Sequence, residues 1–361
     1  MAKIALDQHS VECAVYGGAI LGGGGGGWIE EGMHVGRLAL EIGQPQLFTV
    51  DELDDQDCLV AVSLVGAPGA KEKYVKPIHY SRALELLRKQ FSMPVHGITT
   101  NENGAGTTVN GWFQAAVSGL PVIDCPCNGR AHPTGLMGSL NLSENTDYVS
   151  YQAAVGGKAG RYIELCISGS LNRAASMIRR ASVEAGGLVA VARNPVSVAY
   201  AKQNGAPGAV QQAMAVGEAL LSHQGEAAVE AVVSILDGKV ITTGTVTGYK
   251  METTGGFDVG TIQLDGDYEI TFWNEYMTLE KDGQRLATFP DLIMTLDAKT
   301  ARPVVSAAVE RDQHITVIVA PKENLILGTT MRNKNLLQPI EEIIHKPILP
   351  FVFQHSTYGC G

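Results

Sequence analysis

The densest group of reactive side chains is the ten-residue segment 124–133, which reads DCPCNGRAHP. It contains a carboxylate at Asp124 and thiols at Cys125 and Cys127. An imidazole follows at His132. Thiolate and imidazole are ligands that suit zinc, although zinc sites more often use a CxxC spacing. We therefore predict zinc as a cofactor, with Cys125, Cys127 and His132 as its ligands.

The same segment allows two other interpretations. Cys127 is a candidate nucleophile if Arg130 or His132 stabilises its thiolate. Alternatively, the segment is a proline-braced loop with two buried thiols and a structural pair of Arg130 and Asp124. We favour a functional site, and the choice between a metal ligand and a nucleophile stays open.

A second polar segment, TTNENGAG at 99–106, lies between a predicted strand and a predicted helix. Ligands bind at the carboxyl ends of parallel strands in α/β sheets, where the N-terminus of the next helix offers free N–H groups. Asn101, Glu102 and Asn103 are therefore candidate ligand-binding or catalytic residues. An ordinary turn at Asn103, with Thr107 capping the helix, is the alternative.

Six consecutive glycines occupy positions 22–27, here called the glycine run. The run follows a predicted helix, whereas a dinucleotide-binding glycine motif follows a strand. Glycine costs backbone entropy on folding, so a simple spacer would not favour six of them. We predict that the run, with Gly24 and Gly25 at its centre, approaches a ligand or a neighbouring chain closely.

The elements that must position these groups alternate in the first half of the chain. Apolar periodicity and turn residues predict helices over 8–21, 30–43, 77–91 and 107–118, and strands over 46–50, 58–65, 95–99 and 121–124. This order is typical of a mostly parallel α/β sheet.

The second half contains three predicted helices, over 171–186, 206–222 and 226–236, and then a β-rich region from Lys239 onward. The dipeptides at 265–266 and 282–283 are Asp-Gly hairpin turns and predict an antiparallel meander. The polar stretches 253–257 and 273–275 are interpreted as hairpin turns, with an interdomain cleft as the alternative. We predict an N-terminal α/β domain over 1–165 and a C-terminal α+β domain over 166–361.

The amino-acid composition limits the kinds of partner that the protein is expected to bind. A net charge of −10 without clustered Lys or Arg argues against nucleic acid, which is bound through basic patches. No apolar stretch is long enough for a membrane helix. Only 18% of residues are charged, so part of the surface is expected to be buried in a homo-oligomer. The alternative that the same composition allows is a large core in a monomer.

The cysteines are too sparse for a disulfide scaffold in 361 residues, and Asp7 interrupts the position of a secretion signal. The sequence therefore predicts a cytoplasmic protein with reduced thiols, Cys360 included. Cys13, Cys58 and Cys166, each among apolar neighbours, are predicted to be packing residues.

Taken in order, several segments resemble the S-methyl thiohydantoin desulfurase-like family, which is found beside hydantoinase and oxoprolinase genes. The matching segments are 17–22 with the glycine run, 65–68, 102–104, 119–124, 129–131, 253–257, 274–275 and 290–293. The resemblance covers nearly the whole chain. It departs at 124–131, where the family typically has an Asp-x-Asp stretch and this chain has Pro126 in place of the second carboxylate and two thiols.

The resemblance implies a hydrolase that attacks the carbon between two ring nitrogens of a thiohydantoin or hydantoin-like imide, with sulfide or a thiol leaving if that carbon bears sulfur. Such an enzyme needs an activated water and groups that hold a planar ring. In this sequence Asp124 or Glu102 would move the proton and Arg130 would grip a substrate carboxylate. Asn101, Asn103 and the glycine run would bind the ring. The alternative is a non-catalytic binding subunit of a hydantoinase-type complex.

Overall fold

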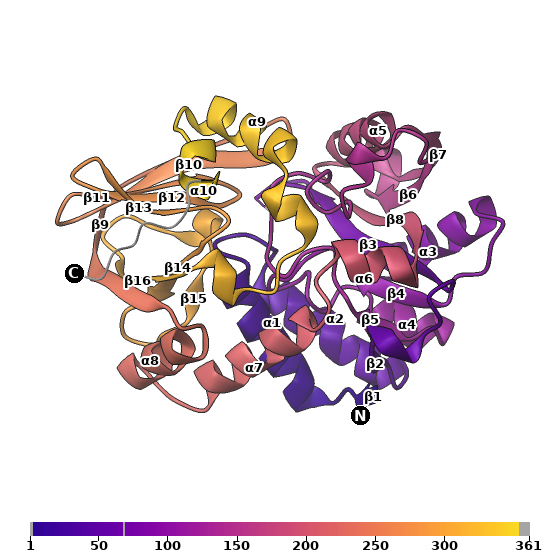
Figure 1. The fold of residues 1–361 in the computed structure, drawn as a ribbon, viewed down its shortest axis with the longest axis horizontal. Coiled ribbons are helices and arrows are strands. Elements are labelled where there is room, and N and C mark those ends of the chain that lie inside the picture. Colours follow the sequence, from indigo (N-terminus) through magenta and orange to yellow (C-terminus); the bar gives the residue numbers. More distant parts are fainter. Residues whose placement is uncertain (1–2, 68, 354–361) are drawn as a thin grey trace.

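The computed structural model describes residues 3–67 and 69–353, so Pro68 and Cys360 lie outside it. Two eight-stranded sheets stand at opposite ends of the molecule, with helices between and around them (Figure 1). None of the helices in the described ranges is long and apolar enough to cross a membrane.

The first sheet is mixed. Its strands in spatial order are β1 (Lys3–Ala5), β2 (Gln46–Thr49), β5 (Val122–Asp124), β4 (Gly97–Thr100), β3 (Cys58–Gly66), β8 (Leu188–Ser197), β6 (Ser150–Gly156) and β7 (Ile163–Gly169). The central run β2, β5, β4 and β3 is parallel, as predicted, and every other pairing is antiparallel. Strands β1 and β6 to β8 are additions to the predicted set.

Helices cover both faces of this sheet. They are α1 (Gln8–Leu21), α2 (Ile29–Ile42), α3 (Pro77–Gln90), α4 (Trp112–Ser118), α5 (Leu171–Glu184) and α6 (Val198–Asn204). Ala153 of β6 packs in the apolar cluster of α3, whereas its neighbour Ala154 packs in that of α5. Because consecutive strand residues point to opposite faces, α3 and α5 lie on opposite sides of the sheet. The predicted helix over 107–118 begins only at Trp112, after turns that end at Gly111 with φ +109°.

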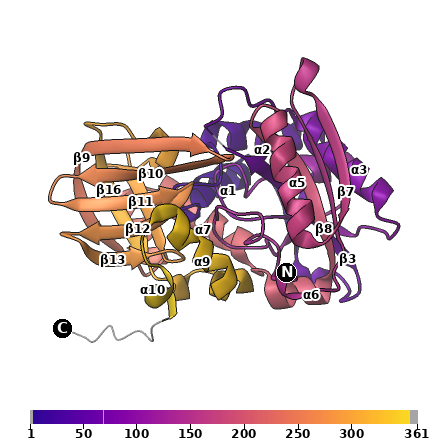
Figure 2. The same cartoon turned by 90° about the horizontal axis from the view of Figure 1, so that it is seen from above.

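The second sheet is antiparallel throughout, as predicted. Its strands in spatial order are β13 (Gln284–Thr288), β12 (Glu275–Lys281), β11 (Tyr268–Trp273), β10 (Phe257–Leu264), β9 (Lys239–Thr254), β16 (His314–Ala320), β14 (Leu292–Asp297) and β15 (Pro303–Val304). Strands β9 to β13 form the meander, with Gly266 and Gly283 in the two predicted hairpin turns. Helices α9 (Lys334–Ile344) and α10 (Leu349–Phe353) pack beside it (Figure 2).

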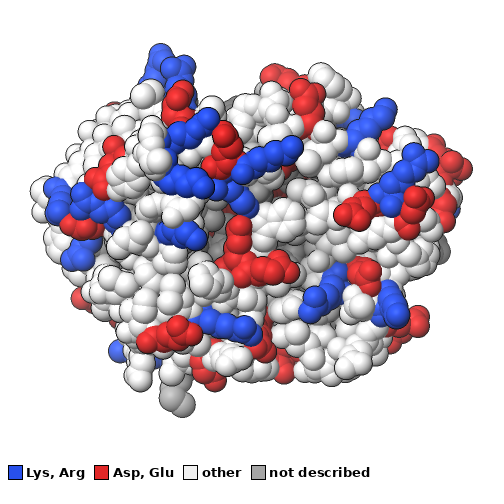
Figure 3. Space-filling view, turned by 180° about the vertical axis from the view of Figure 1, so that it is seen from behind, with Lys and Arg blue, Asp and Glu red and all other residues white. Residues whose placement is uncertain are grey.

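The five described cysteines are free thiols. Cys13 and Cys58 are buried, as predicted for packing residues, but Cys166 is exposed. The reason is that Cys166 lies on the edge strand β7, whose residues alternate between partly buried and exposed. On the face seen in Figure 3, Lys and Arg are interspersed with Asp and Glu, and much of the surface is uncharged.

Helices α1 and α7 (Ala209–Leu221) join the two halves of the chain. Ile20 and Leu21 of α1 belong to the same apolar cluster as α7, α8 (Glu226–Ile235) and the second sheet. The helix backbones approach so closely that a Cβ on Gly217 would lie 1.9 Å from the carbonyl oxygen of Cys13. This contact fixes the relative position of the two sheets.

We expect Gly217→Ala to lower the free energy of unfolding by about 1–3 kcal/mol, because the new methyl group forces the two helices apart. Chemical denaturation of the full chain measures this. Gly160→Ala is the matched control, since no heavy atom lies within 4 Å of the position of its Cβ. Equal stability of the two variants would contradict the close helix contact.

Candidate active site

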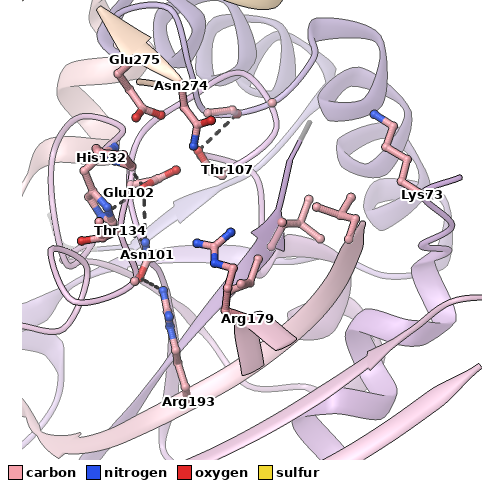
Figure 4. Close-up of a pocket in the computed structure, with 18 of the residues that line it drawn as sticks. Lys73, Asn101, Glu102, Thr107, His132, Thr134, Arg179, Arg193, Asn274 and Glu275 are labelled. Atoms are coloured by element: carbon pink, nitrogen blue, oxygen red, sulfur yellow. Dashed lines mark hydrogen bonds and ion pairs between the residues drawn. The ribbon is translucent and has the colours of Figure 1, made fainter. Parts of the chain in front are cut away.

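A small pocket, partly open to solvent, lies where the two halves meet. Figure 4 shows polar side chains converging on it from both halves. The polar lining residues are Glu31, Lys73, Asn101, Glu102, Thr107, His132, Thr134, Arg179, Arg193, Asn274 and Glu275.

A chain of hydrogen bonds follows the floor of the pocket. Arg193 Nη2 donates to Asn101 Oδ1 over 2.6 Å, and because guanidinium only donates, this bond fixes the amide orientation of Asn101. Asn101 Nδ2 then points at Glu102 Oε2 (3.3 Å) and at His132 Nε2 (3.2 Å). Glu102 Oε2 lies 3.1 Å from His132 Nε2 and also accepts the His132 backbone N–H. The 99–106 and 124–133 segments thus meet, and they contribute Glu102 and His132 as a hydrogen-bonded pair.

Burial controls the protonation of this pair. Loss of solvent raises the pKa of Glu102 to about 8, against the opposing effects of the His132 backbone N–H and of the positive charge on Arg193. Burial also lowers the pKa of His132 to about 3, helped by the charge on Arg193. His132 is therefore neutral at physiological pH, and Glu102 titrates near neutrality, the range that suits general acid–base catalysis.

A second buried carboxylate comes from the C-terminal half. Glu275 follows Asn274 at the turn between β11 and β12, a turn that the sequence predicted, and both residues line the pocket. The pKa of Glu275 is raised well above its usual value by burial and by the nearby Glu102. Its Oε2 is buried and has no hydrogen-bond partner among the described residues. A buried oxygen without a partner is costly, so a bound ligand is its natural partner.

The glycine run lies between the two halves. The carbonyl of Gly23 accepts the backbone N–H of Tyr276 over 2.7 Å, and that of Gly24 accepts the N–H of Ser306 over 2.9 Å. On the other side, Gly26 accepts the N–H of Gly106 over 2.9 Å. The run therefore makes a close backbone approach, as the sequence indicated, but the structure places this approach within the chain.

Individual glycines of the run have different neighbours. A Cβ on Gly24 would meet the Tyr276 ring at 2.9 Å, and a Cβ on Gly25 would lie 1.9 Å from Glu275 Oε1. Neither of these two glycines lines the pocket, whereas Gly26 and Gly27 do. Gly24 and Gly25 were predicted to bind the ring of a substrate, but the structure does not place them in the pocket. Gly25 instead leaves space for the carboxylate of Glu275.

Three of the predicted site residues are occupied by structural contacts outside the pocket. The carboxylate of Asp124 accepts N–H groups from Val210 and Gln211 at the start of α7. Asn103 Nδ2 donates to the carbonyls of Gly129 and Ala209. Their side chains hold the two halves together and do not face a ligand.

Arg130 is the third of these residues. It is fully buried, stacks 4.5 Å from the centroid of Phe289, and donates to the carbonyls of Pro290 (3.0 Å) and Asp291 (2.5 Å). It does not line the pocket, so it is not placed to grip a substrate carboxylate.

The two thiols of the 124–133 segment are buried packing residues. The pKa of Cys127 is raised to about 12 by burial, and that of Cys125 is raised further. Cys125 Sγ points to the carbonyl oxygen of Ala201 at 3.4 Å. A protonated buried thiol is a poor nucleophile. Cys125, Cys127 and His132 are not among the described side chains whose possible ligand atoms all lie within 4.8 Å of one another.

In the described part of the chain, one group of three such side chains does gather. The ligand atoms of His9, Cys13 and Glu218 all lie within 4.8 Å of one another, on α1 and α7. Glu218 contacts His9 Nε2 and accepts from Cys13 Sγ over 3.3 Å. This group could hold a metal ion, and none of its members lines the pocket.

Sequence reasoning missed the cationic side of the pocket. Arg193 interrupts an apolar strand, which is a signal for a functional or paired charge, but that strand was not predicted. Arg179 belongs to the predicted α5 helix, where it resembles an ordinary surface residue. Lys73, ion-paired with Glu31 at 2.9 Å, follows the loop after β3 and carries no sequence signal.

Comparison with known proteins finds a family match for each half of the chain. Family models described as the S-Me-THD-like N-terminal and C-terminal domains match residues 9–161 and 170–334. The chain therefore belongs to the S-Me-THD-like family, as its motifs predicted. A crystal structure of a protein from Chromobacterium violaceum is similar over 99% of both chains, with a TM-score of 0.72 and 21% identity, and shares the fold. No functionally curated protein matches the chain.

We expect Gly25→Ala to abolish any activity of the pocket, because the added methyl group occupies the position of the Glu275 carboxylate. The variant is also expected to lose about 1–3 kcal/mol of folding stability through overpacking. Ligand binding and thermal melting measure the two effects. Gly106→Ala is the control, since its Cβ would lie no closer than 3.7 Å to any heavy atom. Normal ligand binding by Gly25→Ala would contradict the assigned position of Glu275.

Proposed function

We propose that the protein is a hydrolase that attacks the carbon between the two ring nitrogens of a thiohydantoin or a related cyclic imide, and releases a thiol or sulfide when that carbon bears sulfur. One observation carries the proposal: two buried carboxylates with raised pKa values, Glu102 and Glu275, face one pocket from opposite halves of the chain. Such pairs commonly divide the roles of general base and general acid. Membership of the S-Me-THD-like family supports the substrate class.

The environments of the two carboxylates support a division of roles. Glu102 Oε2 accepts hydrogen bonds from Asn101 and from the His132 backbone, and hydrogen bonds to the charged form favour ionisation. No donor among the described residues reaches Glu275 Oε2. Glu102 therefore ionises first and acts as the general base, while Glu275 keeps its proton and acts as the general acid.

The reaction balances with these two groups and one water. Glu102 takes a proton from water as the new C–O bond forms, and Glu275 gives its proton to a ring nitrogen. In the second step the new hydroxyl returns a proton to Glu275, the C–S bond breaks, and the sulfur leaves with the proton held by Glu102. His132 stays neutral throughout and holds Glu102 in position.

The alternative is a binding subunit that holds the same ring without turnover. The two functions differ in one measurement, which is thiol release by the purified chain alone. A chain that binds the ring but releases no thiol would support the binding subunit.

Zinc enters the proposal at a different place from the one the sequence indicated. We propose that His9, Cys13 and Glu218 bind zinc, because imidazole, thiolate and carboxylate are all zinc ligands. This ion would connect α1 with α7 and would stabilise the fold; water activation is assigned to Glu102.

For the chemistry, we expect Glu102→Gln to lower kcat/KM for S-methyl-2-thiohydantoin by about 100- to 10,000-fold. In the unmodified protein, kcat/KM should rise with pH through about 8 as Glu102 loses its proton, and should fall again at higher pH as Glu275 loses its own. A chromogenic thiol reagent measures the rate. Glu30→Gln, which changes an exposed carboxylate on α2, is the control. Full activity of Glu102→Gln, or a rate independent of pH between 6 and about 9, would refute the assignment.

For zinc, elemental analysis of the protein purified with added zinc should find about one ion per chain, as one His-Cys-carboxylate site predicts. Cys13→Ser and His9→Ala should each lose most of it, with a lower melting temperature and no loss of pocket chemistry. His223→Ala, at an exposed histidine just beyond α7, should keep the ion. Full zinc content in Cys13→Ser would rule out this ligand set.

A further inference from the structure

Within residues 3–67 and 69–353, the two sheets end in four edge strands, which are β1, β7, β13 and β15. Strand β1 has three residues, and β15 has two and begins with Pro303. Strand β13 is held against the segment before α10, because Arg285 donates to the carbonyl of Pro347 over 2.9 Å. Strand β7 has seven residues, pairs with β6 without a register shift, and contains neither lysine nor proline. It therefore lacks the features that usually protect an edge strand.

The outer backbone groups of β7 have no partner in the described part of the chain. The backbone hydrogen bonds of residues 163–169 are made with β6, and no loop or helix backbone bonds to them. Figure 1 shows β7 beside α5 at the upper right of the molecule, away from the second sheet. A free row of N–H and C=O groups is a template for another strand. The edge of β7 therefore suits a protein partner.

The side chains of β7 differ between the two faces of the sheet. Those on the α5 face are partly buried and aliphatic: Ile163, Leu165 and Ile167. Those on the other face are exposed: Glu164, Cys166 and Ser168. Glu164 carries the one charge of the strand and is paired with Arg82 over 2.7 Å. The strand thus offers a mostly uncharged surface to a partner.

Exposed apolar side chains flank this edge. Val149 and Tyr162, which precede β6 and β7, are 49% and 48% exposed, and Met177 of α5 is 41% exposed. Met177 is two residues from Arg179, which lines the pocket, so Met177 points to the opposite side of the helix. Apolar side chains that gather at an exposed place are typical of protein interaction sites.

We infer that β7 pairs antiparallel with β7 of a second copy of this chain. A two-fold axis brings a strand to itself in the antiparallel sense and uses the same surface on both chains. Centring the pairing on Cys166 keeps all seven residues paired. The resulting pairs are Ile163 with Gly169, Glu164 with Ser168, Leu165 with Ile167, and Cys166 with itself. The mixed sheets of the two copies then form one continuous sheet.

The chemistry of the strand complements itself in this register. Leu165 meets Ile167 of the second copy on the α5 face, so the apolar cluster continues across the axis. The charge of Glu164 faces the hydroxyl of Ser168, and no like charges lie opposite each other. A second copy is thus a partner that fits the apolar face and the charge of β7 together. This contact would also bury part of the weakly charged surface in a homo-oligomer.

Light scattering of the full chain tests the assembly, and a short bismaleimide tests its register. We expect the mass of a dimer, and a covalent dimer through Cys166, because opposite residues of antiparallel strands have Cα atoms about 4.5–5.5 Å apart. The other four described thiols are buried, and Cys360→Ser removes the thiol outside the described residues. Cys166→Ser in the same background is the control and should remove the covalent dimer. A monomer, or a dimer that is not linked at Cys166, would overturn the inference.

A charge placed on the axis gives a second test. Cys166→Lys sets two ammonium groups opposite each other and should raise the Kd of the dimer by about 5- to 30-fold, as like charges about 5 Å apart at a surface predict. Ser168→Lys is the matched control, because it adds lysine to the same exposed face but opposite Glu164. We expect it to change the Kd by less than about 5-fold.

Sedimentation of both variants measures the Kd, and their melting temperatures, compared with that of the unmodified chain, check that the monomer fold is kept. An unchanged Kd in Cys166→Lys would overturn the inference. Equal weakening by Cys166→Lys and Ser168→Lys would also overturn it, since only the proposed register distinguishes the two positions.

Discussion

The close backbone contact made by the glycine run is the constraint on which the pocket depends. The run bonds to Tyr276 and Ser306 of the C-terminal half and to Gly106 of the N-terminal half, so it sets the distance between the carboxylates that each half supplies. A side chain on Gly25 would occupy space that Glu275 now fills, and a side chain on Gly24 would meet the ring of Tyr276. Glycine is the one residue that permits this approach, which gives the six-residue run a physical reason.

Charge inside the pocket is stabilised unequally. Glu102 and His132 share hydrogen bonds with Asn101, which Arg193 orients, and this part of the pocket is a connected network. Glu275 Oε2 and Arg193 Nε have no hydrogen-bond partner within residues 3–67 and 69–353. Unpaired buried groups reduce stability in the empty protein and are the groups that a ligand can satisfy.

Much of the fold could be predicted from the sequence, because hydrophobic periodicity and turn-forming residues are local properties of the chain. The parallel strands, the antiparallel meander and the Asp-Gly hairpins follow from such signals. The site was half predictable: Glu102, His132 and Asn101 follow strand ends, where ligands gather. Asp124, Asn103 and Arg130 also follow strand ends. Their side chains are hydrogen-bonded to α7 or to the carbonyls of residues 290 and 291, and they do not face the pocket. Only three-dimensional packing separates the two groups. Arg179 and Glu275 come from elements distant in sequence, so spacing could not join them to the site.

The insertion of β8 between β3 and β6 limits how this protein can be divided. The N-terminal family segment ends at residue 161, but the sheet to which it belongs is completed by β7 and β8, and helix α1 packs on α7 from the other segment. Neither segment contains a closed hydrophobic core of its own. The two segments are therefore poor modules for gene fusion or domain exchange, and a change in one must be accommodated by the other. Evolution of a new specificity in this fold is expected to proceed through side chains in the shared pocket, with the chain inherited as a single unit.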